Sequence, residues 1–562
     1  MPVSRLTQSA ALRASVAARS KSIGTAIDVW SGAAILLAAL AALPIAAIVL
    51  SAPSGGLEAI AHLSRTVLGE YVANTALLML GAGGIAAVTG TLCAWLVSAA
   101  RFPGRRILAW ALVLPLAVPA YIGAYIYADL LDFSGPVQSV LRAMTRSANW
   151  FPQIRSLGGG AFVLGLVLYP YVYLLARAAF AAQSRNQFRA ARSLGAGPWQ
   201  AFWRVALPAA RPAIAGGLAL VLMEVLADFG VAQYFAIPTF STGIFRSWLA
   251  MGDKQAALKL AAMMLIFVIA LIAWEARSRS GRSASKDGLT AREDGTPLIE
   301  LSRAGQGLAC LACTLPVLLG FVIPAAHLGW LGLSETAIAA TGDLPAYISG
   351  SLWLGLATAA ACLVAALVLT FARARSSSRV AAAAIRVSTL GYALPGALLA
   401  VGLLAPLGAF DVGLTRWAQG ALGYSGGLIL TGTSAVLIYA LSVRFLTVAF
   451  NTVDGGMSKI PPSLDAAARS LGAGPRRVLA RIYIPLLSPS LAAAAALVFI
   501  DTLRELPATL ILRPFNLETL ATRTYRLASD ERLVEASIPA LILLAAGLLP
   551  VLLLTRSGRK SS

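Results

Sequence analysis

Apolar runs long enough to cross a membrane recur along this chain. The clearest extend from Trp30 to Leu50 and from Gln306 to Ala326, and neither contains a charged residue. Each matches the roughly 20 residues that a helix needs to cross the hydrocarbon core of a bilayer. Of the 562 residues, 58% are hydrophobic and 12% are charged, whereas soluble domains are about 45–50% apolar. The sequence therefore predicts an integral membrane protein.

The apolar pattern predicts an all-α fold with about twelve transmembrane helices. Lys and Arg concentrate in every second loop, and short loops rich in these residues remain in the cytoplasm. We therefore expect a multi-pass protein with both termini in the cytoplasm. The first run exceeds the roughly 7–15 residues of a signal-peptide core, so we expect it to stay as a membrane helix. The expected helices cover residues 30–50, 72–99, 108–130, 158–180, 212–235, 256–276, 306–328, 348–371, 387–408, 424–448, 488–511 and 536–555.

The formal net charge of +21 could suggest nucleic-acid binding. A nucleic-acid interface gathers its basic residues in one patch or stripe. Here they are spread over seven loops. We therefore expect no nucleic-acid partner, and we attribute the charge to membrane orientation.

Metal, redox and catalytic sites are not evident in the sequence. Cys310 and Cys313 form a C-x-x-C, but inside an apolar run they are expected to be small packing residues. His62 and His327 are the only histidines, and neither has a neighbouring cysteine or histidine to complete a zinc site. The sequence has no G-x-x-x-x-G-K-[ST] to bind nucleotide phosphates. We expect no cofactor and no enzymatic activity in this chain.

The two halves of the chain are copies of one another. The segment AARSLGAGPWQAFWRVALPAARP begins at Ala190 and returns at Ala467 as AARSLGAGPRRVLARIYIPLLSP, an offset of 277 residues. Each half holds six helices and begins in the cytoplasm, which predicts parallel repeats around an axis along the membrane normal. Further pairs at the offset of 277 residues are Glu224 with Asp501, Asp228 with Glu505, Thr242 with Thr519, Arg246 with Arg523, Trp248 with Tyr525 and Asp253 with Asp530. Earlier in each half, the offset is 276 residues, and the pairs are Tyr71 with Tyr347 and Pro119 with Pro395.

This repeat sets the expected domain boundaries. The stretch joining the two halves is polar and rich in Ser, Gly and Arg, as in a flexible linker. We expect a cytoplasmic tail (1–29), a first membrane domain (30–276) with its largest cytoplasmic loop at 181–211, a linker (277–305), a second membrane domain (306–555) with its largest cytoplasmic loop at 451–486, and a cytoplasmic tail (556–562).

The duplicated loop is expected to form a compact helix-turn-helix outside the bilayer. In both copies we expect a short helix ending at a glycine, a turn continued by a proline, an amphipathic helix and a break at a second proline. A helix that only connected two spans would have no reason to be the most faithfully duplicated part of the chain. The residues concerned are Gly195, Pro198 and Pro208 in the first copy and Gly472, Pro475 and Pro485 in the second.

Both loops resemble a motif of ABC importer permeases that work with a binding protein. The motif is E-A-A-x3-G-x9-I-x-L-P, and the resemblance implies a type I permease fold in which these loops are coupling helices that dock into the ATPase. Arg189 and Ala466 replace the motif's Glu, and Asp465 lies one residue too early to align with it. The docking position is still expected, but the sequence does not predict the carboxylate contact to the ATPase. The other matching residues are Ala190, Ala191, Gly195, Val205, Leu207 and Pro208 in the first copy and Ala467, Ala468, Gly472, Ile482, Ile484 and Pro485 in the second.

The late part of each half resembles fused, two-domain ferric iron permeases. The segments are 222–253 and 504–531, and the overall similarity covers most of residues 60–555. The resemblance implies ferric iron import across a bacterial inner membrane, with a homodimeric ATPase and a periplasmic binding protein as partners. Related permeases import thiamine, phosphonates or polyamines, and these remain alternatives.

A major facilitator transporter is the alternative from another class. Such transporters also have twelve helices in two parallel halves, and RFPGRR (101–106) resembles their basic loop motif. That motif expects an upstream Gly and an Asp, which are absent here. The facilitator alternative also gives no reason for two matching loops between the fourth and fifth helices.

Four acidic residues are expected to line the translocation pathway: Glu224, Asp228, Asp501 and Glu505. Each half contributes a pair spaced i, i+4, which places both carboxylates on one helix face. Ionisable groups inside a membrane usually face a water-filled cavity or a partner. We expect transient contacts with a passing cation and no stable metal site. The alternatives are an ion pair, with Arg504 as the candidate partner, or a helix end in the headgroup region.

Overall fold

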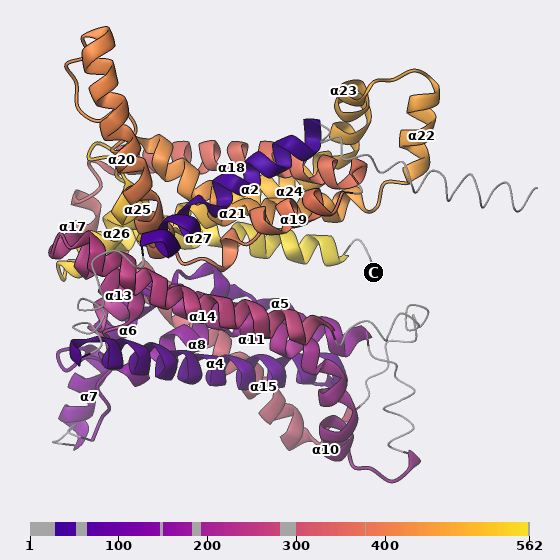
Figure 1. Ribbon diagram of the computed structural model, residues 1–562. Coiled ribbons are helices and arrows are strands. Elements are labelled where there is room, and N and C mark those ends of the chain that lie inside the picture. Colours follow the sequence, from indigo (N-terminus) through magenta and orange to yellow (C-terminus); the bar gives the residue numbers. More distant parts are fainter. Residues whose placement is uncertain are drawn as a thin grey trace, which may run out of the picture. The chain divides into compact units, whose positions relative to one another are not determined.

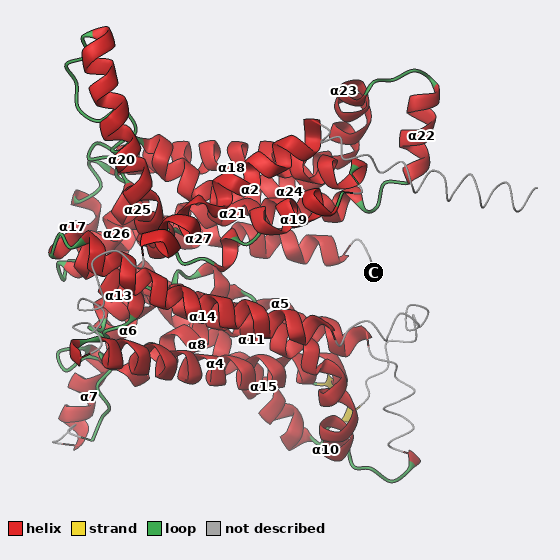
Figure 2. Ribbon diagram, viewed as in Figure 1, coloured by secondary structure: helices red, strands yellow, loops and turns green. Residues whose placement is uncertain are grey.

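The protein is almost entirely helical in a computed structural model, which describes residues 29–51, 65–145, 150–182, 193–280, 299–376 and 378–559 (Figures 1 and 2). Within these ranges, the strands form one parallel pair, β1 (Ala100–Arg101) and β2 (Ile299–Glu300). The predicted all-α class is confirmed. Strand β2 lies at the C-terminal end of the linker, and it pairs with β1, which directly follows helix α4 (Leu68–Ala99).

Ten helices of the described chain are long and apolar enough to cross a membrane, and a bent pair adds an eleventh. They are α2 (Val29–Ser51), α4 (Leu68–Ala99), α8 (Leu157–Ala182), α10 to α11 (Trp199–Ala227), α14 (Lys254–Ser280), α15 to α16 (Arg303–Gly332), α18 (Leu344–Arg375), α20 (Gly396–Leu422), α21 (Ser434–Met457) and η8 to α24 (Leu479–Arg504). The last expected helix is α27 (Leu533–Arg559), whose apolar part is shorter.

Shorter elements connect these spans. In the first half they are α5 (Arg105–Ala111), η1 (Leu114–Ala117), α6 (Ala120–Leu131), α7 (Pro136–Thr145), α12 (Gly230–Tyr234), α13 (Phe240–Phe245) and η3 (Arg246–Ala250). In the second half they are α17 (Glu335–Ala339), α19 (Arg379–Ser388), η7 (Gly391–Ala393), α22 (Pro462–Ser470), α23 (Pro475–Val478), α25 (Pro507–Leu512) and α26 (Leu520–Ser529).

The third helix of each half is broken, which corrects the expected continuous helices 108–130 and 387–408. In the first half, the stretch before Pro119 and the stretch after it are bent by 91°. In the second half, α20 begins only after Pro395. Proline lacks an N–H and forces the preceding residue into an extended conformation. Val118, at ψ 117°, has that conformation.

The tenth helix begins ten residues later than expected, at Ser434. The Asp411 carboxylate, fully buried in α20, accepts hydrogen bonds from the backbone N–H groups of Ile429, Leu430 and Thr431 at 2.6–3.0 Å. These donors would otherwise belong to the first turns of a helix. Gly423, at φ +65°, ends α20. The segment between α20 and α21 is therefore a loop held by one carboxylate.

The chain divides into two compact units that cut across the repeat. One contains the described parts of Met1–Leu43, Ala357–Tyr392 and Ser442–Val498; the other contains those of Pro44–Leu356, Ala393–Leu441 and Phe499–Ser562. In the first unit, the Phe371 ring packs against Trp30 and Tyr483, at centroid distances of 4.6 and 5.7 Å.

The larger unit is built around α8, which packs against α4 and α11 (Figure 1). The helices approach closely at glycines. A Cβ on Gly90 of α4 would lie 2.8 Å from both the Tyr169 carbonyl oxygen and the Val172 Cβ, and one on Gly217 of α11 would lie 2.7 Å from the Val172 Cα. Small residues at such crossings let membrane helices pack backbone to backbone.

Replacing Gly90 with valine should destabilise this packing. Overfilling a well-packed contact costs about 1–3 kcal/mol, so we expect a lower thermal unfolding temperature in detergent and less folded protein. Gly84→Val is the matched control, because a Cβ at Gly84 of the same helix meets nothing within 4 Å. Equal unfolding temperatures for Gly90→Val and Gly84→Val would contradict the close approach of α4 and α8.

Candidate functional site

The second duplicated loop has the expected helix-turn-helix start. Helix α22 ends at Ser470, Gly472 takes φ +77°, and α23 begins at Pro475. The Ala473 N–H donates to the Ala468 carbonyl at 3.0 Å, which closes the helix end in the geometry that follows a left-handed residue. A side chain at Gly472 would be strained by that φ value. Ala466, Ala467 and Ala468 lie on α22.

The first loop shows the same turn. Gly195 takes φ +85°, and α10 begins at Pro198. The helix expected before this turn lies largely outside the described residues, as do Arg189, Ala190 and Ala191. The part that the structure describes therefore places Gly195 at the same kind of turn as Gly472.

The breaks expected at Pro208 and Pro485 are wrong, because the chain continues as a helix through both prolines. A π-helical turn precedes each of them. The Leu207 N–H donates to the Phe202 carbonyl and the Ile484 N–H to the Leu479 carbonyl, five residues back. Such a bulge keeps a helix continuous where a normal turn would be interrupted. Val205 and Ile482 lie within these turns.

Aromatic contacts fix both loops to the membrane helices. In the first half, Phe202 is buried, with its ring centroid 5.0 Å from Trp95 of α4, 6.4 Å from Phe180 of α8 and 5.3 Å from Trp199. In the second half, Tyr483 is buried against Phe371 of α18. Each duplicated loop is thus joined to the membrane helices through a buried aromatic side chain.

Two exposed leucines were missed by the sequence analysis. Leu194 and Leu471 directly precede the turn glycines, and each is 87% exposed. An apolar side chain at the tip of an exposed loop, repeated in both halves, is typical of a residue that becomes buried on binding. The signal was present in the sequence, because SLGAGP occurs in both loops, but the importer motif does not specify this position.

The fifth helix of each half ends at its second acidic residue. Helix α11 ends at Ala227, and Asp228 accepts a hydrogen bond at 3.0 Å from the Ala232 N–H of α12. Glu505 follows α24 and accepts from the N–H groups of Ala508 and Thr509 at 3.1 and 3.0 Å. The two acids thus satisfy the free N–H groups at the starts of α12 and α25.

These positions correct the expectation that each pair shares the face of one continuous helix. Glu224 and Asp501 lie inside α11 and α24, whereas Asp228 and Glu505 lie just beyond them. In the first half, Glu224 still interacts electrostatically with Asp228.

The repeat register changes after the two breaks. Helices α13 and α26 each start with a reciprocal capping box, formed by Thr239 with Thr242 and by Thr519 with Thr522. Thr239 therefore corresponds to Thr519, an offset of 280. The three extra residues of the second half are one in α25, which is longer than α12, and two in the connection to α26. The pairs expected at offset 277 from Thr242 with Thr519 onward, including Arg246 with Arg523, are wrong.

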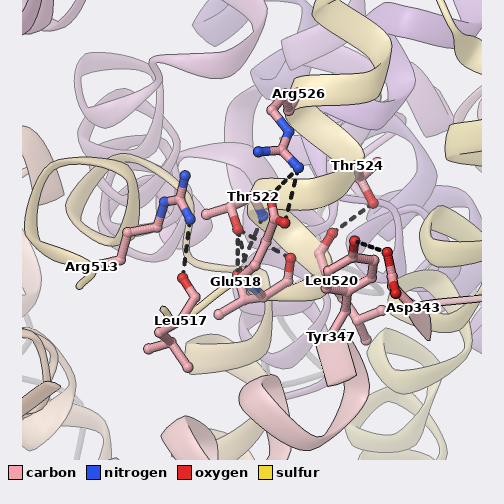
Figure 3. Close-up of polar contacts among 10 residues, drawn as sticks. Asp343, Tyr347, Arg513, Leu517, Glu518, Leu520, Thr522, Thr524 and Arg526 are labelled. Atoms are coloured by element: carbon pink, nitrogen blue, oxygen red, sulfur yellow. Dashed lines mark hydrogen bonds and ion pairs between the residues drawn. The ribbon is translucent and has the colours of Figure 1, made fainter. Parts of the chain in front are cut away.

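A polar network surrounds the start of α26 (Figure 3). Arg526 forms an ion pair with Glu518 at 3.0 Å, and Arg513 donates to the Leu517 carbonyl at 3.0 Å. At offset 280, Arg526 corresponds to Arg246, which lines a pocket of about 360 Å³ with Tyr71 and other residues. The two halves therefore differ in polar detail around one repeated framework.

The described residues contain no group of three His, Cys, Asp or Glu side chains that could hold a metal ion. His327 pairs with Asp129 at 2.6 Å, and His62 lies outside the described residues. Cys310 and Cys313 are free thiols in α15.

Comparison with known proteins places both halves in one family. The model for the binding-protein-dependent transport system inner membrane component matches residues 83–274 and 363–560. The chain is 25% identical over 524 residues to the Fe(3+)-transport system permease protein FbpB 2 of Haemophilus influenzae, covering 92% of this chain and 96% of that protein.

Shorter relatives match a smaller part of the chain. The sulfate transport system permease protein CysT of Synechocystis sp. is 30% identical over 203 residues, covering 36% of this chain and 69% of that protein. The molybdenum transport system permease protein ModB of Escherichia coli (strain K12) is 26% identical over 207 residues, covering 34% and 88%. The family model matches the chain twice, and both matched regions contain membrane-spanning helices, which excludes the major facilitator alternative. This chain therefore belongs to the inner membrane permeases of binding-protein-dependent ABC transport systems, with two permease domains fused in a single polypeptide.

Proposed function

We propose that this permease imports ferric iron delivered by a periplasmic binding protein. The observation that carries the proposal is the match to the Fe(3+)-transport permease, which extends over both halves and 96% of that protein. The sulfate and molybdenum permeases match about a third of this chain. Oxyanion import is therefore the second candidate, and thiamine, phosphonate and polyamine import remain alternatives.

Energy for import would come from a separate ATPase at the cytoplasmic face. The chain supplies two coupling loops, so we propose that one permease binds a homodimer of ATPase subunits. Leu194 and Leu471 would enter its docking clefts, with Gly195 and Gly472 allowing the tight turns behind them. In this proposal both termini would be in the cytoplasm, as the distribution of Lys and Arg also predicts.

The pathway would pass the ends of the two fifth helices. We propose that Glu224, Asp228, Asp501 and Glu505 line it. In support, Asp228 and Glu505 lie where the helices are interrupted, and irregular backbone at membrane depth is tolerated where it is buried in protein or lines a cavity. Carboxylate oxygens are hard ligands that suit a highly charged cation.

Uptake by a deletion strain tests the substrate. The strain should lose growth on a ferric salt without siderophores, and the intact gene should restore it. Growth limited by sulfate, molybdate or thiamine should be unchanged. Normal ferric uptake without the permease would contradict the iron proposal, and a defect confined to sulfate or molybdate would favour the second candidate.

Replacing both exposed leucines tests coupling. Full burial of a leucine contributes about 1.5–3 kcal/mol, so Leu194→Ser with Leu471→Ser should reduce ATPase binding and ATP-dependent uptake at least tenfold. Single variants should have smaller, unequal effects, because the two loops differ in sequence. The measurements are co-purification of the ATPase and uptake into vesicles.

Leu333→Ser is the matched control for these variants. Leu333 is 80% exposed at the far end of the α15–α16 span and should leave both measurements unchanged. Normal ATPase binding by the Leu194→Ser, Leu471→Ser double variant would contradict the coupling assignment.

A further inference from the structure

Two tyrosine hydroxyls are buried without hydrogen-bond partners in α6. Tyr125 is 0% exposed and Tyr121 is 6% exposed, and neither hydroxyl has a partner in the structure. Buried polar groups are almost always hydrogen-bonded, so such exceptions need an explanation. The two rings contact each other, with centroids 5.8 Å apart.

These tyrosines lie between the two helix breaks. A Cβ on Gly230, which follows the first break, would lie 2.4 Å from the Tyr121 Cβ and 3.5 Å from a methyl group of Leu506, which follows the second. The Tyr121 hydroxyl interacts electrostatically with Arg504 and, more weakly, with Glu505. The Tyr125 hydroxyl interacts in the same way with Asp228. Tyr121 thus packs against the residue that follows the first break, which in turn lies close to Leu506 after the second, and the charge of one acidic residue from each half acts on this pair of hydroxyls.

Packing alone does not account for the hydroxyls. The prolines that precede α6 and α20 align Tyr121 with Ala397 and Tyr125 with Val401, and both of these residues are completely buried. The repeated fold is thus built without tyrosine in the second half. Phenylalanine would fill the same space in the first half and would bury no unpaired oxygen.

Tyr169 of α8 provides an internal comparison. Its hydroxyl is also buried without a partner, but its electrostatic neighbours are Cys93, Tyr173 and Cys313. Among the unpartnered tyrosines of the described chain, those of α6 are the ones whose hydroxyls interact electrostatically with carboxylates, one from each half.

We propose that Tyr121 and Tyr125, together with Asp228 and Glu505, form a transient oxygen-ligand site for the ferric ion between the two permease domains. The proposal rests on the ferric iron function proposed above. Phenolate and carboxylate oxygens are hard donors, which suit a trivalent cation. Each phenol that binds as phenolate releases one proton to the water accompanying the ion. A carboxylate offers about four lone-pair positions, so one that caps a helix can still bind a cation.

The site is closed in this structure. Tyr121 and Tyr125 belong to an apolar cluster that includes Val118, Leu503 and Leu506, and that cluster excludes water from the hydroxyls. The ion would reach them only after the two breaks move apart. Closure would then bring back the apolar surroundings and favour release, as transport requires a site that binds weakly enough to let the ion leave.

Removing only the hydroxyls tests this proposal. Tyr121→Phe with Tyr125→Phe keeps both rings, and Tyr169→Phe removes an equally buried hydroxyl elsewhere. With the complete transporter in proteoliposomes, binding protein loaded with radioactive ferric ion outside and ATP inside, we expect the double variant to lose at least tenfold in uptake rate. Tyr169→Phe should retain the parent rate. ATPase binding should be unchanged in all variants, and the thermal unfolding temperature should be equal or higher, because each substitution removes a buried unpaired oxygen.

The possible outcomes separate the two proposals. If the parent complex transports no ferric ion, the proposed function fails. If the parent transports it and the double variant matches the parent, the tyrosine site is overturned while the function stands. Equal loss in Tyr169→Phe, or a lower unfolding temperature that accounts for the loss in the double variant, would also overturn it. If the double variant does not assemble, the single variants decide, and each should lose uptake while Tyr169→Phe does not.

Discussion

The hydrogen-bonding demand of the backbone governs this structure. In a bilayer each unpaired N–H or C=O costs several kcal/mol, so a membrane helix can be interrupted only where other groups take up the freed donors. Here carboxylates do so. Asp228 and Glu505 bind the N–H groups at the starts of α12 and α25, and Asp411 binds three N–H groups ahead of α21. Acidic residues that look costly in an apolar sequence are what make the interruptions possible.

Asp228 and Glu505 cap helices and are also proposed to line the translocation pathway. In the proposed pathway, a carboxylate that caps a helix would link passage of a cation to the local backbone. An ion drawing on Asp228 or Glu505 would compete with the N–H groups of the following helix, and that competition would loosen the break. Hydrogen bonds to charged groups contribute about 1.5–3 kcal/mol.

The sequence predicted the elements that follow from composition and left out those set by single contacts. Apolar length and loop charge predicted most spans, and the repeated SLGAGP predicted the turns at Gly195 and Gly472. The late start of α21 could not be predicted, because it depends on Asp411 reaching a loop about twenty residues away. The change of register before α26 was hidden because Thr and Arg occur at both offsets. Tyr121 and Tyr125 align with Ala397 and Val401 in the second half, so residues shared by the two halves do not include them.

The strand pair that joins the linker to the first half has a consequence for assembly. Because β2 pairs with β1, the start of the second half is attached to the first half. The two halves also belong to one polypeptide, so they do not have to find each other by diffusion. Linkage of this kind replaces bulk concentration by a high local one. Covalent fusion also fixes the composition of the chain, because each polypeptide carries one half with the tyrosine pair and one with Ala397 and Val401. The two halves were therefore free to diverge from one another.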